Sequence, residues 1–227
     1  MKSLYLHSAL LKVVTAALFT TFSATAAGPW QTLVDGKSLA GWVNGSAPDG
    51  KPGPGWTVGE GMLHLKGKGG NLVSEKEYSS FELEWEWRIA EGANNGVKYW
   101  VTQVGPKREW LGIEYQMIDD VRNSDALIGG SHTTACIYDI KAAKADKPVK
   151  PAGEWNTSRV VVSDGKIQHW LNGKLVVEAD TKAAEWKALV GQSKFKDKEG
   201  FAPGKGKIML TDHQDETWFR NMKIREL

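Results

Sequence analysis

The sequence predicts an all-β protein of the sandwich type, and three observations lead to that class. Short apolar segments recur about every ten residues and are separated by turn-forming residues, as in β-sandwiches. The segment 81–89, FELEWEWRI, alternates strictly between large apolar and charged side chains, which is typical of a strand with one buried and one solvated face. The chain also combines 11 Trp with 25 Gly residues; large aromatic residues favour strands, and glycines favour tight turns.

Each expected strand is a short apolar or alternating run bounded by turn residues. These runs are 30–34, 56–58, 62–65, 71–74, 81–89, 96–101, 112–118, 134–138, 156–163, 166–171, 174–179, 206–211 and 216–226. Asp164-Gly165 and Asn172-Gly173 are signatures of two-residue hairpin loops, so we expect the three strands between 156 and 179 to form a meander. One short helix is expected within 183–190, and no segment has the composition of an interdomain linker.

The N-terminus has the features of a secretory signal peptide. Two lysines precede the apolar run 13–19, and residues 24–26 supply a small-x-small cleavage pattern. The apolar run is too short to span a membrane. A lipoprotein would carry a cysteine at the cleavage site, and this sequence has none there. We therefore expect residues 1–26 to be removed and residues 27–227 to form a single domain. It would be periplasmic or extracellular, with no attachment to the membrane after cleavage.

Charge and cysteine content exclude several classes of protein. The 29 basic and 27 acidic residues give a net charge of +2, which argues against a nucleic-acid-binding protein with a basic face. The only cysteine, Cys136, rules out an internal disulfide, so the exported domain must be stabilised by packing. Cys136 lies in an apolar segment, which favours a thiol buried in the core over a nucleophile.

The central segments carry polar side chains that share one face of a sheet. Glu114 and Gln116 are two residues apart in the expected strand 112–118, so both point the same way. Carboxylate, amide and aromatic groups on an open sheet commonly bind sugars, since rings cover apolar C–H faces and polar groups pair with hydroxyls. The residues that we predict to bind substrate are Asn94, Lys98, Trp100, Tyr115, Gln116 and Asp119.

A series of motifs along the chain resembles the 3-keto-disaccharide hydrolase domain family. The motifs are LVDGKSLAGW at 33–42, FEL at 81–83, NNGV at 94–97, GIEYQ at 112–116, residues 135–139, GEWN at 153–156, LNG at 171–173, DH at 212–213 and WFRN at 218–221. The resemblance covers essentially the whole mature chain. It implies a concanavalin A-like jelly-roll sandwich of two curved antiparallel sheets with a ligand site on the concave face. It also implies cleavage of the glycosidic bond in sugars oxidised to a ketone at C3.

Two positions depart from the family pattern. Asn95 stands where a related pattern often has serine, a change of little consequence. An arginine expected near the end of that strand is replaced by the Trp100-Val101 region, so the cation that contacts the sugar is not identified by the resemblance.

The chemistry of a 3-keto sugar indicates roles for the polar residues. A ketone acidifies the neighbouring C2 proton, so cleavage by elimination and hydration requires a general base, an electrophile at the ketone oxygen and an acid for the leaving oxygen. Glu114 is the expected base or a metal ligand, and Gln116 positions the substrate. Lys98, His132 or His213 supplies the electrophile or the acid, with His132 and His213 as the catalytic histidines.

Two other functions fit the same residues. A non-catalytic carbohydrate-binding module of this fold would use the aromatic and amide groups and need no base. Alternatively, Glu114-x-Gln116-x-x-Asp119 is similar to the Glu-x-Asp-x-x-Glu strand of laminarinase-type retaining glycosidases. That reading requires two carboxylates on one face, about 5–5.5 Å apart, which a β-bulge between Gln116 and Asp119 would provide.

The sequence implies no obligatory cofactor, but it leaves a divalent metal open. Glu114, Asp119, His132 and His213 carry suitable ligand atoms, and a metal ion would polarise a ketone. None of them has the close spacing of a metal-binding motif. The expected partner is a small carbohydrate substrate, whose sugar and linkage the sequence does not specify. The sequence does not define the oligomeric state either.

Overall fold

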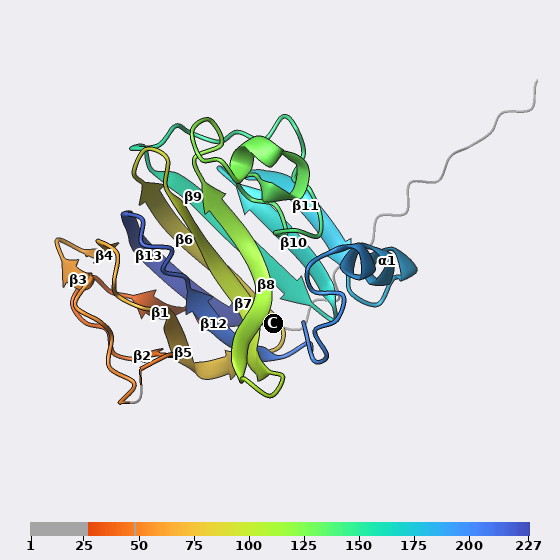
Figure 1. The fold of residues 1–227 in the computed structure, drawn as a ribbon. Coiled ribbons are helices and arrows are strands. Elements are labelled where there is room, and N and C mark those ends of the chain that lie inside the picture. Colours follow the sequence, from red (N-terminus) through yellow and green to blue (C-terminus); the bar gives the residue numbers. More distant parts are fainter. Residues whose placement is uncertain (1–26, 48) are drawn as a thin grey trace, which may run out of the picture.

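Two antiparallel sheets pack face to face in the computed structural model, which describes residues 27–47 and 49–227 (Figure 1). The eight-stranded sheet has the order β11-β10-β9-β6-β13-β4-β3, and β1 pairs with β13 beside this path. The five-stranded sheet has the order β2-β5-β12-β7-β8, with β8 toward the viewer in Figure 1. The arrangement confirms the all-β class and the concanavalin A-like sandwich.

The element bounds follow the expected strands closely. The eight-stranded sheet contains β1 (Gln31–Val34), β3 (Trp56–Gly59), β4 (Met62–Leu65), β6 (Phe81–Ile89), β9 (Asn156–Ser163), β10 (Lys166–Leu171), β11 (Lys174–Asp180) and β13 (Thr217–Glu226). The five-stranded sheet contains β2 (Trp42–Asn44), β5 (Leu72–Tyr78), β7 (Asn94–Val104), β8 (Glu109–Ile118) and β12 (Gly206–Leu210). The helices are α1 (Ala184–Gln192) and two 3-10 turns, Ala126–Ile128 and Gly130–His132. No helix in the described part of the chain is long and apolar enough to cross a membrane. The predicted signal peptide lies outside the described residues.

The alternation in the FELEWEWRI segment places one side of β6 in the core. Phe81, Leu83, Trp85, Trp87 and Ile89 are all at most 2% exposed. From the facing sheet, the aromatic ring of Tyr115 packs edge-on against Trp85 with centroids 4.9 Å apart. The two sheets are therefore joined by an aromatic layer that excludes water, which is what a domain without a disulfide requires.

Both predicted hairpins are present between β9, β10 and β11. Asp164 and Gly165 have φ values of 49° and 83°, and Asn172 and Gly173 have values of 46° and 81°. Two successive left-handed residues are the signature of a type I′ turn, whose twist matches that of the flanking strands.

The expected strand at 134–138 is wrong. The segment forms only isolated bridges, from Ile137 to Tyr115 and to Lys141, and it bends sharply because Ala135 and Asp139 have left-handed φ values of 66° and 57°. Its backbone still bonds to β8: the amide of Ala135 donates to the carbonyl of Gln116, and the amide of Tyr138 donates to that of Glu114. The segment thus covers the open edge of β8, which is the last strand of its sheet.

The side chain of His169 on β10 ties this covering segment to the core. It is fully buried, its Nδ1–H donates to the carbonyl of Ala135 at 2.9 Å, and its Nε2 accepts a hydrogen bond from the Tyr99 hydroxyl at 2.9 Å. The ring is therefore neutral and held in one tautomer. Burial lowers the pKa of His169 to about 4, because there is no water to solvate the imidazolium.

This histidine predicts a specific pH dependence of stability. The unfolded chain binds a proton at His169 below its ordinary pKa of about 6.5, whereas the folded protein does so only below about 4. The free energy of unfolding should therefore fall as the pH drops through this window, by up to about 3 kcal/mol from this residue.

The measurement is urea unfolding at several pH values for the wild type and His169→Gln. The variant should be less stable at neutral pH and show a shallower pH slope between pH 6.5 and 4. An unchanged slope would show that His169 does not titrate as its burial implies.

Candidate functional site

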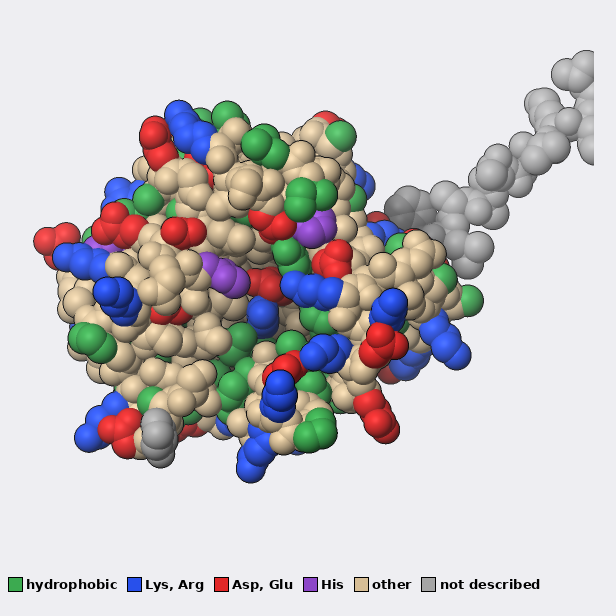
Figure 2. Space-filling model, viewed as in Figure 1, with side chains coloured by type: hydrophobic (Ala, Val, Ile, Leu, Met, Phe, Trp, Pro, Cys, Tyr) green, Lys and Arg blue, Asp and Glu red, His purple; other side chains and the backbone are tan. Residues whose placement is uncertain are grey.

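The outer face of the five-stranded sheet carries the polar residues that the sequence singles out. In the β7–β8 ladder, Lys98 pairs with Glu114 and Gly96 pairs with Gln116. Their odd-numbered neighbours on both strands point into the core, so these residues point to the opposite face. Figure 2 shows that face hollowed near its centre, where acidic, basic and histidine side chains meet.

Glu114 lies at the centre of this group and is 5% exposed. One carboxylate oxygen, Oε2, is 3.3 Å from the ammonium of Lys98, and Oε1 is 3.9 Å from Nε2 of His213. Burial opposes the charge of Glu114, but Lys98, His213 and Lys194 outweigh it and hold the pKa of the carboxyl below its ordinary value. Glu114 is therefore an ionised carboxylate at neutral pH.

Three buried oxygen atoms on this face lack a hydrogen-bond partner. Within the described chain, no hydrogen bond reaches Oε1 of Glu114, Oε1 of Gln116 or Oδ1 of Asn94. Leaving such an acceptor unsatisfied costs about 1–3 kcal/mol, so these atoms are suited to receive hydrogen bonds from a ligand or from water. They include two of the residues predicted to bind substrate and the predicted base.

Gly96 makes room for the carboxylate of Glu114. A Cβ atom at position 96 would lie 2.2 Å from Oε1 and 2.9 Å from the carboxyl carbon of Glu114. Any side chain at this position would therefore displace the carboxylate from its place over β7. The Asn94-Asn95-Gly96 motif thus has a physical reason for ending in glycine.

His213 reaches the site from the turn between β12 and β13. The neighbouring Asp212 fixes this turn, because its carboxylate accepts hydrogen bonds from the amides of Gly69 and Gly70 at 2.7 and 2.8 Å. The side chain of His213 is 44% exposed, so its imidazole can exchange protons with solvent while it lies beside Glu114.

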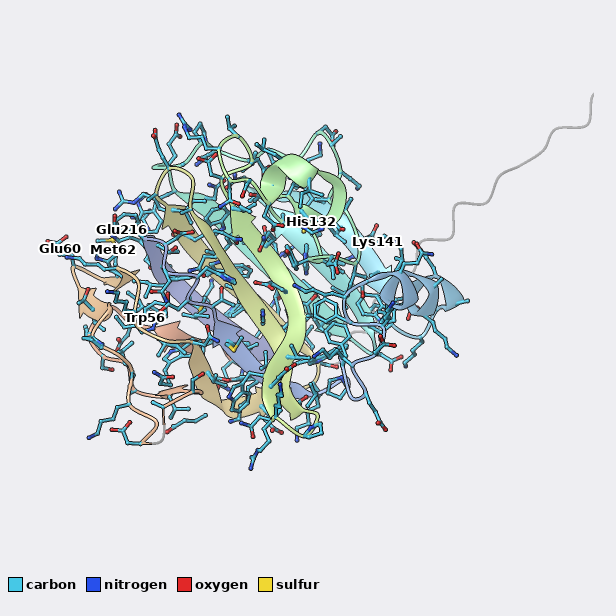
Figure 3. All side chains as sticks on the ribbon, viewed as in Figure 1. Trp56, Glu60, Met62, His132, Lys141 and Glu216 are labelled. Carbon is cyan, nitrogen blue, oxygen red and sulfur yellow. The ribbon has the colours of Figure 1, made fainter. Side chains whose placement is uncertain are left out.

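His132 belongs to a second cluster on the loop that follows β8. Figure 3 shows it among the loops beside that strand. Its Nδ1 is 2.9 Å from Asp125, its Nε2 is 3.4 Å from Asp139, and its ring packs edge-on against Tyr138 at 5.0 Å. Both ring nitrogens thus face a carboxylate. Burial, together with Asp125, raises the pKa of Tyr138, which therefore keeps its phenolic proton.

Lys194 completes the site and was not foreseen from the sequence. It follows α1, its backbone amide donates to Asp139 at 2.7 Å, and its ammonium lies 4.1 Å from the centre of the Tyr138 ring. Lys194 is an exposed residue, yet partial desolvation of its ammonium by the surrounding protein lowers the pKa of Lys194, and the charge of Glu114 partly opposes this shift. No local pattern marks this lysine, because only the fold brings its segment to β8.

Two aromatic residues predicted to bind substrate lie instead in the core. Tyr115 is 0% exposed, and its hydroxyl is bonded to Ser158 and to the carbonyl of Trp170 in the facing sheet. Trp100 is two residues after Lys98 on β7, so in a regular strand it would share the outer face. A bulge with a left-handed φ of 51° at Trp100 turns its ring inward instead. There its indole N–H donates to the carbonyl of Ser79. These two predictions are therefore corrected.

Asp119 is a turn residue and does not join Glu114 as a carboxylate of the site. Its oxygens accept hydrogen bonds from the amides of Gly92 at 2.8 Å and Val121 at 3.0 Å. The ladder between β7 and β8 is regular from Ile113 to Ile118, so no bulge brings Asp119 to the face of Glu114. Glu114 and Asp119 therefore do not form the pair of carboxylates that a laminarinase-type enzyme requires, and the expected substrate contact at Asp119 is corrected as well.

The candidate metal ligands are divided between the two clusters. Glu114 and His213 approach each other, whereas His132 is held by Asp125 and Asp139. In residues 27–47 and 49–227, no group of three or more His, Cys, Asp or Glu side chains is arranged to hold a metal ion. Lys98 and Lys194 also place positive charge near Glu114, which opposes binding of a cation there.

Comparison with known proteins gives relatives over nearly the whole chain. A "3-keto-disaccharide hydrolase" of Bacteroides thetaiotaomicron is 29% identical over 228 aligned residues, covering 86% of this chain and 78% of the relative. A crystal structure from Parabacteroides distasonis, provisionally described as a glycosyl hydrolase, is 31% identical with a TM-score of 0.77. That alignment covers 88% of this chain and 94% of the other.

More distant structures share the fold. A Bacillus subtilis protein of unknown function with a galectin-like fold has a TM-score of 0.54 at 11% identity, covering 91% of this chain and 98% of that one. At the level of sequence, the model of the 3-keto-alpha-glucoside-1,2-lyase-like domain matches residues 29–225. The chain therefore belongs to the family of 3-keto-alpha-glucoside-1,2-lyase-like domains.

Proposed function

We propose that this protein is an exported hydrolase that cleaves the glycosidic bond of 3-keto-glycosides by elimination followed by hydration. The observation that carries the proposal is the buried, ionised carboxylate of Glu114 on the outer face of the five-stranded sheet, where one of its oxygens has no hydrogen bond and cationic groups lie around it. Family membership and the relative named 3-keto-disaccharide hydrolase support a carbohydrate-active hydrolase. A lone base surrounded by positive charge suits proton removal next to a ketone, whereas two opposed carboxylates suit direct displacement at C1.

The reaction proceeds through an enolate. Glu114 takes the proton from C2, and the electron pair of the C2–H bond moves to give a C2=C3 double bond and a negative ketone oxygen. The enolate then re-forms the ketone, a C1=C2 double bond forms, and the C1–O bond breaks with a proton going to the leaving oxygen. Water adds its hydroxyl to C1 and a proton to C2, so the net change is hydrolysis. The "1,2-lyase" of the family description corresponds to the elimination half.

The remaining polar residues have complementary roles. Lys98, 3.3 Å from Glu114, keeps the base ionised until the substrate binds. His213, which is partly exposed and 3.9 Å from Glu114, delivers the proton to the leaving oxygen. His132 faces carboxylates at both nitrogens, so it holds the second cluster in place. Gln116 and Asn94 offer buried acceptor oxygens to sugar hydroxyls.

Replacing the base tests this function directly. Glu114→Gln keeps the shape of the side chain and removes its basicity, so release of 3-ketoglucose from a 3-keto-glucoside such as 3-keto-trehalose should fall by about 10²–10⁴-fold. Binding of the keto-sugar should survive. The measurement is product analysis of purified wild type and variant, each with and without a chelator.

The matched control is Glu60→Gln, since Glu60 lies on the β3–β4 hairpin, far from His132 in Figure 3. It should retain wild-type turnover. If the wild type binds keto-sugars but releases no product from any of them, the protein is a carbohydrate-binding module. If the chelator abolishes release, a divalent metal belongs to the site.

Gly96→Ala tests the placement of the carboxylate. The new methyl group would overlap Oε1 of Glu114 and push the base away from C2, so turnover should fall about 100-fold, since misplacing a reacting group by an ångström has an effect of that order. Stability should fall by about 1–3 kcal/mol from overpacking.

The control for this substitution is Gly59→Ala at the end of β3, where an added Cβ meets no atom within 4 Å. Turnover measurements and thermal unfolding on both variants separate the two effects. Wild-type turnover in Gly96→Ala would show that the carboxylate position does not matter for catalysis.

A further inference from the structure

We propose that Lys194 is a catalytic residue of this site, with its ammonium donating a hydrogen bond to the ketone oxygen of the substrate as the enolate forms. This inference rests on the proposed function, in which no residue has yet been assigned to stabilise the ketone oxygen. Nothing in the sequence motifs points to this lysine, which lies on the segment between α1 and β12.

The elimination needs a cation at the ketone oxygen that is separate from the base. The base acts on C2 and the cation acts on the oxygen at C3, so each must contact a different atom of the same substrate. Lys98 lies 3.3 Å from Glu114, and its charge is largely directed to that carboxylate. His213 also lies against Glu114. Lys98 and His213 both lie beside the base, so neither is placed to contact the ketone oxygen while Glu114 contacts C2.

Lys194 satisfies this separation. Its ammonium lies over the ring of Tyr138, whose backbone amide donates to the carbonyl of Glu114, and the charges of the two residues influence each other's pKa values. In the described chain, the ammonium forms no ion pair with a carboxylate. The ammonium is therefore not committed to the base and is free to contact the substrate. The ammonium lies 4.1 Å from the centre of the Tyr138 ring and, among the described residues, donates no hydrogen bond, so all three of its N–H groups can serve a ligand.

The surrounding residues hold the lysine in position. Its backbone amide is bonded to Asp139, whose other oxygen lies 3.4 Å from His132. His132 in turn packs against Tyr138, which supports the lysine side chain. The role of the second cluster in the proposed reaction is to hold this cation in position near the base. The pKa of Lys194, lowered by burial, also makes its ammonium a stronger hydrogen-bond donor.

Kinetics on a 3-keto-glucoside test this role with Lys194→Met, Lys194→Arg and the control Lys196→Met. Lys196 is exposed and lies two residues further along the same segment. Lys194→Met should lower kcat about 10²–10³-fold with little change in KM, the loss typical of an oxyanion donor. Lys194→Arg should recover part of the rate, and Lys196→Met should match the wild type.

The pH profile distinguishes a catalytic cation from a structural one. The active form of Lys194 is protonated, so activity should decline as the pH rises through its lowered pKa. Arginine stays charged at higher pH, so Lys194→Arg should move this decline to higher pH. If Lys194→Met and Lys196→Met have equal rates while the wild type cleaves the substrate, the inference is wrong and the proposed function stands. If the wild type cleaves no keto-sugar, both fail.

Discussion

The carboxylate of Glu114, lying over Gly96 and beside Lys98, is the constraint on which the site depends. Burying an ionised carboxylate costs several kcal/mol unless charge and hydrogen bonds compensate it. Here Lys98 supplies the compensation from the neighbouring strand, and the absence of a side chain at Gly96 supplies the space. One oxygen is nevertheless left without a partner. The sheet thus keeps the carboxylate ionised in a buried position with one oxygen unbonded, as the base of the proposed reaction requires.

The loops around the five-stranded sheet add further residues to the site. The segment after β8 covers the open edge of that strand, and the buried His169 fastens it to the core through the carbonyl of Ala135. The same segment carries Asp139, which accepts a hydrogen bond from the backbone amide of Lys194, just after the end of α1. Parts of the chain that are distant in sequence are therefore brought to one face of the five-stranded sheet. A rigid sheet holds the base while the loops bring in the other functional groups.

Structure prediction from local sequence works here where a pattern has one physical cause. Strict alternation and Asn-Gly or Asp-Gly pairs predicted β6 and both hairpins, and residues two apart on a strand placed Glu114 with Gln116. It failed where the backbone departs from that regularity. The left-handed bulge at Trp100 reverses the expected parity, and the left-handed Ala135 turns an expected strand into a bend. No sequence pattern marks Lys194, because its place beside Asp139 and Tyr138 arises from tertiary contacts that no nearby motif encodes.

The most direct test of the central claim is isotope incorporation at C2. Wild-type protein would cleave a 3-keto-glucoside in D₂O, and the released 3-ketoglucose would be analysed by NMR before it exchanges with solvent. Proton abstraction by Glu114, elimination and hydration predict deuterium at C2 in the enzymatic product, above the level in 3-ketoglucose incubated without enzyme. Product with no enzyme-dependent deuterium at C2 would contradict the account and indicate cleavage at C1 without an enolate.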